Sequence, residues 1–193
     1  MKSTVLVFIS LVAISINVSW GQKGDTALLL IDIQNFYFPG GKSELVEPEK
    51  AAMNAAKLLA EFRKQSLPVI YVCHRSNSQS GINDIVSPLT GEKIFLKDAV
   101  NSFIGTNLLE FLRSNKITSL VICGMQTHMC VEAATRAASD LGFSCTLIHD
   151  ACATKDLVFE DRIIKAADVH YSTLSTLRYY SRVISTEEFL GSK

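Results

Sequence analysis

The stretch from Ile117 to Leu141 constrains the fold more than any other part of the chain. Its first part, Ile117–Cys123 (ITSLVIC), is an apolar, β-branched run that is typical of a buried strand. Its last part, Val131–Leu141, is rich in alanine and amphipathic, which predicts a helix. The short turn between them places Cys130 at the start of the helix, beyond the carboxyl end of the strand. Open α/β sheets bind and convert their ligands at that edge.

The same alternation of strands and helices continues on both sides of this unit. A long helix is predicted from Asp156 to about Leu177, followed near the carboxyl end by a short helix that Thr186 caps. This alternation implies one three-layer α/β/α domain with a parallel, Rossmann-like sheet and right-handed crossovers. The remaining predicted strands are Ala27–Ile31, Leu67–Cys73, Lys93–Leu96, Phe143–His149 and Arg182–Ile184, and the remaining helices begin near Pro48 and Thr106.

Composition excludes several classes of partner. The chain has 193 residues, enough for one domain with a sizeable core, and its 19 basic residues balance its 19 acidic residues. It has no basic face, charge block or low-complexity run, which argues against nucleic-acid binding and against disorder. We therefore expect a small molecule or a protein as the partner.

The amino-terminal residues 1–21 are interpreted as a secretory signal peptide. Lys2 supplies a positive start, Val5–Ile14 an apolar centre, and Ser19-Trp20-Gly21 small residues at a cleavage site. The alternative is an uncleaved anchor, because Ser3–Gln22 carries no charge and is about long enough to span a membrane. With cleavage, residues 22–193 form the mature domain, which is exported to the periplasm or secreted and has no stable membrane insertion.

The cysteines do not form the pattern of a disulfide framework. Their number, 5, is odd, and three of them lie in predicted strands. We expect mostly free, buried thiols at Cys73, Cys123, Cys130, Cys145 and Cys152.

Three chemically distinct side chains are expected at one edge of the sheet. The start of a helix favours a thiolate, so Cys130 should be more reactive than an ordinary thiol, although a buried cysteine can also be a small apolar side chain. Asp32 ends the first strand and Lys97 ends the third. Taken singly, Asp32 is better interpreted as a helix cap or turn residue, and Lys97 as a solvated surface amine. Together with Cys130 they form an acid, an ammonium and a nucleophile at three strand ends.

The order of motifs along the chain resembles the isochorismatase-like cysteine hydrolases, a family that includes nicotinamidase, N-carbamoylsarcosine amidohydrolase and streptothricin hydrolase. The resemblance covers about residues 25–190, and it is the ordered set of motifs that is specific. The matching motifs are Leu29-Leu30-Ile31-Asp32-Ile33-Gln34-Asn35-Phe36, Phe95-Leu96-Lys97 with Asn101-Ser102-Phe103, Gly124-Met125-Gln126-Thr127-His128-Met129-Cys130-Val131, and His149-Asp150-Ala151-Cys152-Ala153-Thr154.

This resemblance implies a strand order of 3-2-1-4-5-6 and a catalytic triad of Asp32, Lys97 and Cys130. Cys130 attacks a carbonyl to form an acyl-enzyme that water then hydrolyses. Asp32 takes the thiol proton and passes it to the leaving amine, and Lys97 holds Asp32 ionised and favours thiolate through its charge. The backbone N–H groups of Gln126 and Cys130 form the oxyanion hole, with a cis peptide bond between Met125 and Gln126. A homo-oligomer without a cofactor is also implied.

The substrate is expected to be a small amide. Family members that hydrolyse the vinyl ether of isochorismate commonly lack this cysteine, so Cys130 favours amide hydrolysis over that alternative. The metal-binding Asp-x-His pair of nicotinamidases is missing from Tyr71–Asn77, so we expect no metal. Phe36, His74 and His128 are candidate substrate-binding residues, with a turn or loop role as the alternative for both histidines. A binding protein that keeps the fold without turnover is the remaining hypothesis.

Overall fold

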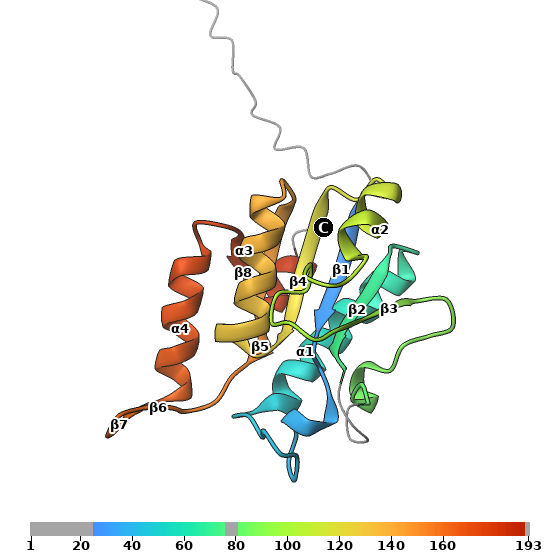
Figure 1. Ribbon diagram of the computed structural model, residues 1–193. Helices are drawn as coiled ribbons and strands as arrows, with labels where there is room; N and C mark the ends of the chain where they lie inside the picture. Colours follow the sequence, from blue (N-terminus) through green and yellow to red (C-terminus); the bar gives the residue numbers. More distant parts are fainter. Residues whose placement is uncertain (1–24, 76–80, 192–193) are drawn as a thin grey trace, which may run out of the picture.

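A six-stranded, all-parallel sheet forms the centre of the protein (Figure 1). The computed structural model describes residues 25–75 and 81–191, so the predicted signal peptide lies outside the described residues and stays a prediction. The strands follow the order β3-β2-β1-β4-β5-β8, which confirms the predicted topology. Their bounds are β1 Thr26–Ile31, β2 Val69–His74, β3 Lys93–Lys97, β4 Ser119–Met125, β5 Ser144–Ala153 and β8 Arg182–Ile184.

Helices cover both faces of this sheet, which explains why its central strands are apolar throughout. In β1, every residue from Ala27 to Ile31 is buried. Helix α1 packs with α5 and with β5, whereas α3 packs with α4 and with the same strand. Helix α1 turns its apolar stripe toward the sheet, and Ala51, Leu58 and Phe62 on this stripe are buried. The helices are α1 Pro48–Lys64, α2 Leu108–Ser114, α3 Glu132–Asp140, α4 Ala166–Leu177 and α5 Thr186–Gly191.

The prediction of a long helix from Asp156 is wrong as far as Lys165. Leu157–Phe159 (β6) and Arg162–Ile164 (β7) instead pair as an antiparallel hairpin, and α4 begins only at Ala166. Two of the three residues in each short run are β-branched or aromatic, and Glu160 turns the chain with a left-handed φ of 55°. The hairpin extends away from the sheet (Figure 1, lower left) and exposes the apolar side chains Val158, Phe159 and Ile163. The expected homo-oligomer stays a prediction.

Two features of the strands at the carboxyl edge of the sheet set the position of the site: a close approach at Gly124 and a register shift in the pairing of β4 with β5. Gly124 in β4 pairs with Ile31 in β1, and a Cβ at Gly124 would lie 2.0 Å from the Ile31 carbonyl oxygen. Its φ of 135° also suits only glycine. A register shift after Ile122 lets β5 run on to Ala153, beyond the predicted end at His149. These contacts bring Asp32, which follows Ile31 directly, beside the loop that follows β4.

No helix within residues 25–75 and 81–191 is both long enough and apolar enough to cross a membrane.

The cap of the last helix is Ser185 and not the predicted Thr186. The Ser185 hydroxyl accepts the N–H of Glu188 at 3.1 Å, and the Glu188 carboxylate accepts the N–H of Ser185 at 2.7 Å. This is a capping box. Thr186 instead anchors the helix to the sheet, because both its N–H and its hydroxyl donate to Asp150 at 2.8 Å.

Replacing the capping serine should therefore lower stability. We expect Ser185→Ala to reduce the free energy of unfolding by about 0.5–2 kcal/mol, measured by urea denaturation. Ser185→Thr is the matched control, because threonine also caps helices, and it should stay close to the wild-type value. Equal losses in both variants would contradict the capping role.

Candidate active site

The three side chains predicted to form a triad meet at the carboxyl edge of the sheet. Asp32 follows β1, Lys97 ends β3, and Cys130 lies in the π-helical turn Thr127–Val131 between β4 and α3. The Lys97 Nζ lies 2.9 Å from Asp32 Oδ2 and 3.3 Å from Cys130 Sγ. Asp32 and Lys97 are fully buried, and Cys130 is 2% exposed. Segments that are far apart in sequence thus place a carboxylate, an ammonium and a thiol in one buried cluster.

The Lys97 ammonium is satisfied entirely within the protein. Besides its ion pair with Asp32, it donates to the Ala99 carbonyl oxygen at 3.1 Å and to the Cys130 sulfur. A charge buried without a partner costs several kcal/mol, so this lysine and this aspartate depend on each other for their burial. The ammonium is therefore fixed between the carboxylate and the thiol.

A second ring of contacts, which the sequence did not reveal, holds Asp32 in place. Its Oδ1 accepts the backbone N–H of His74 at 2.9 Å. The fully buried side chain of Gln34 accepts the same N–H at 2.9 Å through Oε1, and its Nε2 donates to the His74 carbonyl at 3.2 Å. Gln34 belongs to the same motif as Asp32, and its only sequence signal was a polar amide two residues after Asp32. It ties the end of β2 to the loop after β1.

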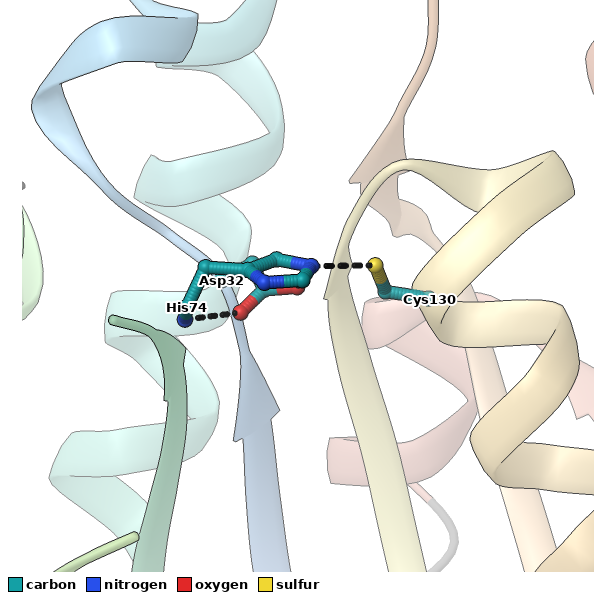
Figure 2. Close-up of side chains that lie close together, drawn as sticks. All are labelled: Asp32, His74 and Cys130. Atoms are coloured by element: carbon teal, nitrogen blue, oxygen red, sulfur yellow. Dashed lines mark hydrogen bonds and ion pairs between the residues drawn. The ribbon is translucent and has the colours of Figure 1, made fainter. Parts of the chain in front are cut away.

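His74 reaches the reacting atoms themselves. As Figure 2 shows, its imidazole lies between the ends of the β1 and β4 segments, facing the Cys130 sulfur. Its Nε2 is 3.5 Å from Cys130 Sγ and 3.9 Å from Asp32 Oδ2. Burial lowers the pKa of His74 and outweighs the opposite effect of the Asp32 charge, so the imidazole is neutral at neutral pH. This candidate substrate-binding residue therefore contacts the thiol.

The start of the helix does not make Cys130 a thiolate at rest. Burial above all, together with the neighbouring Asp32 charge, raises the pKa of the Cys130 thiol to about 12, and Lys97 offsets this only in part. Desolvation penalises the charged sulfur, and the start of the helix does not compensate for this penalty. All five cysteines are free and buried, as predicted. Cys130 therefore rests as a neutral thiol and needs a base before it can act as a nucleophile.

The loop that carries Cys130 has the predicted backbone form. The Met125–Gln126 peptide bond is cis. Gln126 is 5% exposed, and its side chain hydrogen-bonds with Tyr37, a residue that sequence analysis did not single out. Tyr37 lies in the short 3-10 helix Asn35–Tyr37 and is buried, and burial raises its pKa. The roles of Gln126 and Cys130 as oxyanion donors stay predictions.

The two other candidate substrate-binding residues lie at the border of the site. His128 is not a solvent-facing turn residue, because its Nδ1 contacts the Thr154 hydroxyl at 2.6 Å, at the end of β5. Next to it, the Thr127 hydroxyl donates to the Ala153 carbonyl at 3.2 Å. Phe36 packs against Tyr37 with ring centroids 4.2 Å apart. These contacts brace the loops on either side of the thiol.

Asp32, His74 and Cys130 also form the one group of metal-ligating side chains found within residues 25–75 and 81–191. Their ligand atoms all lie within 4.8 Å of one another, and zinc accepts oxygen, nitrogen and sulfur donors. The Lys97 ammonium, however, already lies 2.9 Å and 3.3 Å from two of these atoms. A divalent cation would have to enter beside a buried positive charge, so the donor set fits the ammonium better than a metal.

The raised pKa of Cys130 predicts a distinctive pH profile of alkylation. Only the thiolate reacts, so the rate of Cys130 modification by iodoacetamide should be low at pH 7 and rise about tenfold per pH unit until the protein unfolds. Peptide mapping by mass spectrometry separates this cysteine from the other four. A plateau between pH 6 and 8 would contradict the account, because it would reveal a thiolate already formed.

Comparison with known proteins places this site in a family. Residues 26–188 match the family model of the isochorismatase domain. The uncharacterized isochorismatase family protein YddQ of Bacillus subtilis is 44% identical over 177 residues, covering 86% of this chain and 98% of that protein. An isochorismatase structure from Pseudomonas putida is 30% identical with a TM-score of 0.83, covering 89% of this chain and 93% of that chain. Streptothricin hydrolase of Streptomyces noursei is 29% identical over 68% of this chain, which spans half of that protein. The chain belongs to the isochorismatase family of hydrolases.

Proposed function

We propose that this hydrolase cleaves a carbon–nitrogen bond of the amide type in a small molecule, through a thioester on Cys130. One observation carries the proposal: the Cys130 sulfur lies 3.3 Å from the Lys97 ammonium, within 4.8 Å of the Asp32 carboxylate, and is shielded from water. A structural cysteine has no need of a buried ion pair beside it, whereas a nucleophile needs a base and a stabilising charge.

Asp32 is the base for the first half of the reaction. Its carboxylate takes the proton from the Cys130 thiol as the sulfur attacks the substrate carbonyl. The thiol is protonated at rest, so this transfer coincides with the attack and avoids a buried, unpaired thiolate. When the carbon–nitrogen bond breaks, Asp32 returns the proton to the leaving amine. Lys97 stabilises the negative charge that moves between carboxylate and sulfur, because it contacts both atoms.

The oxyanion of the tetrahedral intermediate is assigned to the backbone N–H groups of Gln126 and Cys130. Losing one such donor typically raises the barrier by about 2.7–4 kcal/mol. Support comes from the loop itself, which is held at both sides: the Gln126 side chain bonds with Tyr37, and the following Thr127 is bonded to Ala153. Preorganised donors of this kind stabilise the transition state without reorganising.

Two alternatives rank lower. Hydrolysis of a vinyl ether needs no nucleophile, so it gives no reason for a thiol in contact with a buried ammonium and carboxylate. A binding protein without turnover leaves the same contacts unexplained, since a buried ion pair is a poor source of stability. Streptothricin hydrolase, which this chain matches over half of that protein's length, is by its name a hydrolase. This similarity supports a hydrolase here.

The proposal is tested by trapping the acyl-enzyme. The full chain is incubated with a pooled library of small primary and secondary amides, with a chelator present throughout, and its intact mass is recorded after rapid acid quenching. We expect an acyl adduct that maps to Cys130, and a loss of turnover of at least about 10³-fold in Cys130→Ala. Cys145→Ala is the matched control, because Cys145 is also buried but lies outside the site. Hydrolysis that persists in Cys130→Ala would contradict the proposal.

A further inference from the structure

We propose that His74 is the general base of the second half-reaction, in which water hydrolyses the Cys130 thioester. This inference rests on the proposed function, because it concerns the acyl-enzyme formed there. It assigns two bases to two half-reactions: Asp32 serves acylation, and His74 serves deacylation.

Within the cluster around the thiol, His74 is the side chain that solvent reaches. The side chain of His74 is 25% exposed, whereas those of Asp32 and Lys97 are fully buried. Oδ2 of Asp32 faces the ammonium at 2.9 Å, and Oδ1 accepts a backbone N–H. A water molecule that arrives from outside therefore meets the imidazole before it meets the carboxylate.

The imidazole is also correctly placed for the bond that must break. Its Nε2 lies 3.5 Å from Cys130 Sγ, the atom that carries the acyl group (Figure 2). The thioester carbon is bonded to that sulfur, so a water held by Nε2 lies within reach of it. A general base needs hydrogen-bond distance, direct or through one water, to the proton it abstracts.

The position of the ring is fixed by the backbone that carries it. The His74 N–H is shared between Asp32 and Gln34, and its carbonyl accepts from the same glutamine. Being the last residue of β2, it also continues the pairing with Lys97 in β3. The charged groups that act on the ring are Asp32, Lys97 and Asp98, and burial dominates over them, which leaves the imidazole neutral and able to accept a proton.

The step balances without any further reactant. The water oxygen bonds to the thioester carbon while one water proton moves to His74 Nε2. The tetrahedral intermediate then collapses, the carbon–sulfur bond breaks, and the sulfur leaves with the bonding electron pair. His74 delivers its proton across the 3.5 Å gap to Sγ, which restores the neutral thiol and the neutral imidazole. The product leaves as the carboxylic acid.

The test separates the two half-reactions with p-nitrophenyl acetate, which acylates a nucleophile and releases a coloured phenolate. In the wild type we expect a burst of one equivalent per active site, followed by steady turnover. His74→Gln should keep the burst amplitude, while its steady-state rate falls by about 10²–10⁴-fold and acetylated Cys130 accumulates in the intact mass. The retained burst itself reports a folded site.

His149→Gln is the matched control. His149 is another partly buried histidine, on β5, where its charge acts on His170 and Glu188, and this variant should behave as the wild type. Hydroxylamine is the second readout, because it attacks a thioester without needing a base. It should restore phenolate release in His74→Gln and yield acetyl hydroxamate, which a residue with a purely structural role would not produce.

Three outcomes would overturn the inference, and they are distinguishable. An unchanged steady-state rate in His74→Gln shows that another group activates the water. A burst that falls together with the steady-state rate places His74 in acylation or in folding. If the wild type forms no adduct on Cys130, there is no acyl-enzyme. This result would contradict both the proposed function and the role of His74.

Discussion

The buried ion pair between Asp32 and Lys97 is the interaction on which the site depends. Neither side chain reaches solvent, and their charged atoms lie 2.9 Å apart at the ends of β1 and β3, which β2 separates in the sheet. Each charge alone would be strongly destabilising there, so the fold can hold both or neither. The pair places a carboxylate and an ammonium beside the Cys130 thiol. His74, at the end of that intervening strand, holds the carboxylate through its backbone N–H, which the Gln34 side chain in the loop after β1 also accepts.

Much of this arrangement could be predicted from the sequence, because hydrophobic patterns that repeat along the chain determine the sheet. Strands that are apolar at every position must be covered on both faces, which requires a parallel sheet with helices on each side. Polar residues directly after such strands then gather at one edge. Asp32, Lys97 and Cys130 were predictable for this reason, and the resemblance of the motifs supplied the strand order that brings β1 beside β4.

Features that the sequence could not predict depend on burial by residues far away in the chain, or on competition between two local structures or two hydrogen-bond partners. The apolar residues of β6 and β7 could also form one face of a helix. Only the pairing of the two strands with each other favours the hairpin over the helix. The cap moved from Thr186 to Ser185 because Asp150, 36 residues earlier in the chain, takes the threonine hydroxyl. The high pKa of Cys130 follows from desolvation by the packed core, and no motif encodes it. The contacts of Gln34 and Tyr37 likewise depend on the folded loops.

The central claim, that Asp32 is the base for Cys130, is tested most directly by a charge-neutral double variant. Asp32→Asn and Lys97→Met each leave one buried charge unpaired, at a cost of about 3–5 kcal/mol, whereas the double variant removes both charges and should recover most of that stability in urea denaturation. The account predicts that the folded double variant nonetheless shows no burst of Cys130 acylation by p-nitrophenyl acetate. Acylation at the wild-type rate in this variant would contradict it, because the thiol would then lose its proton without Asp32.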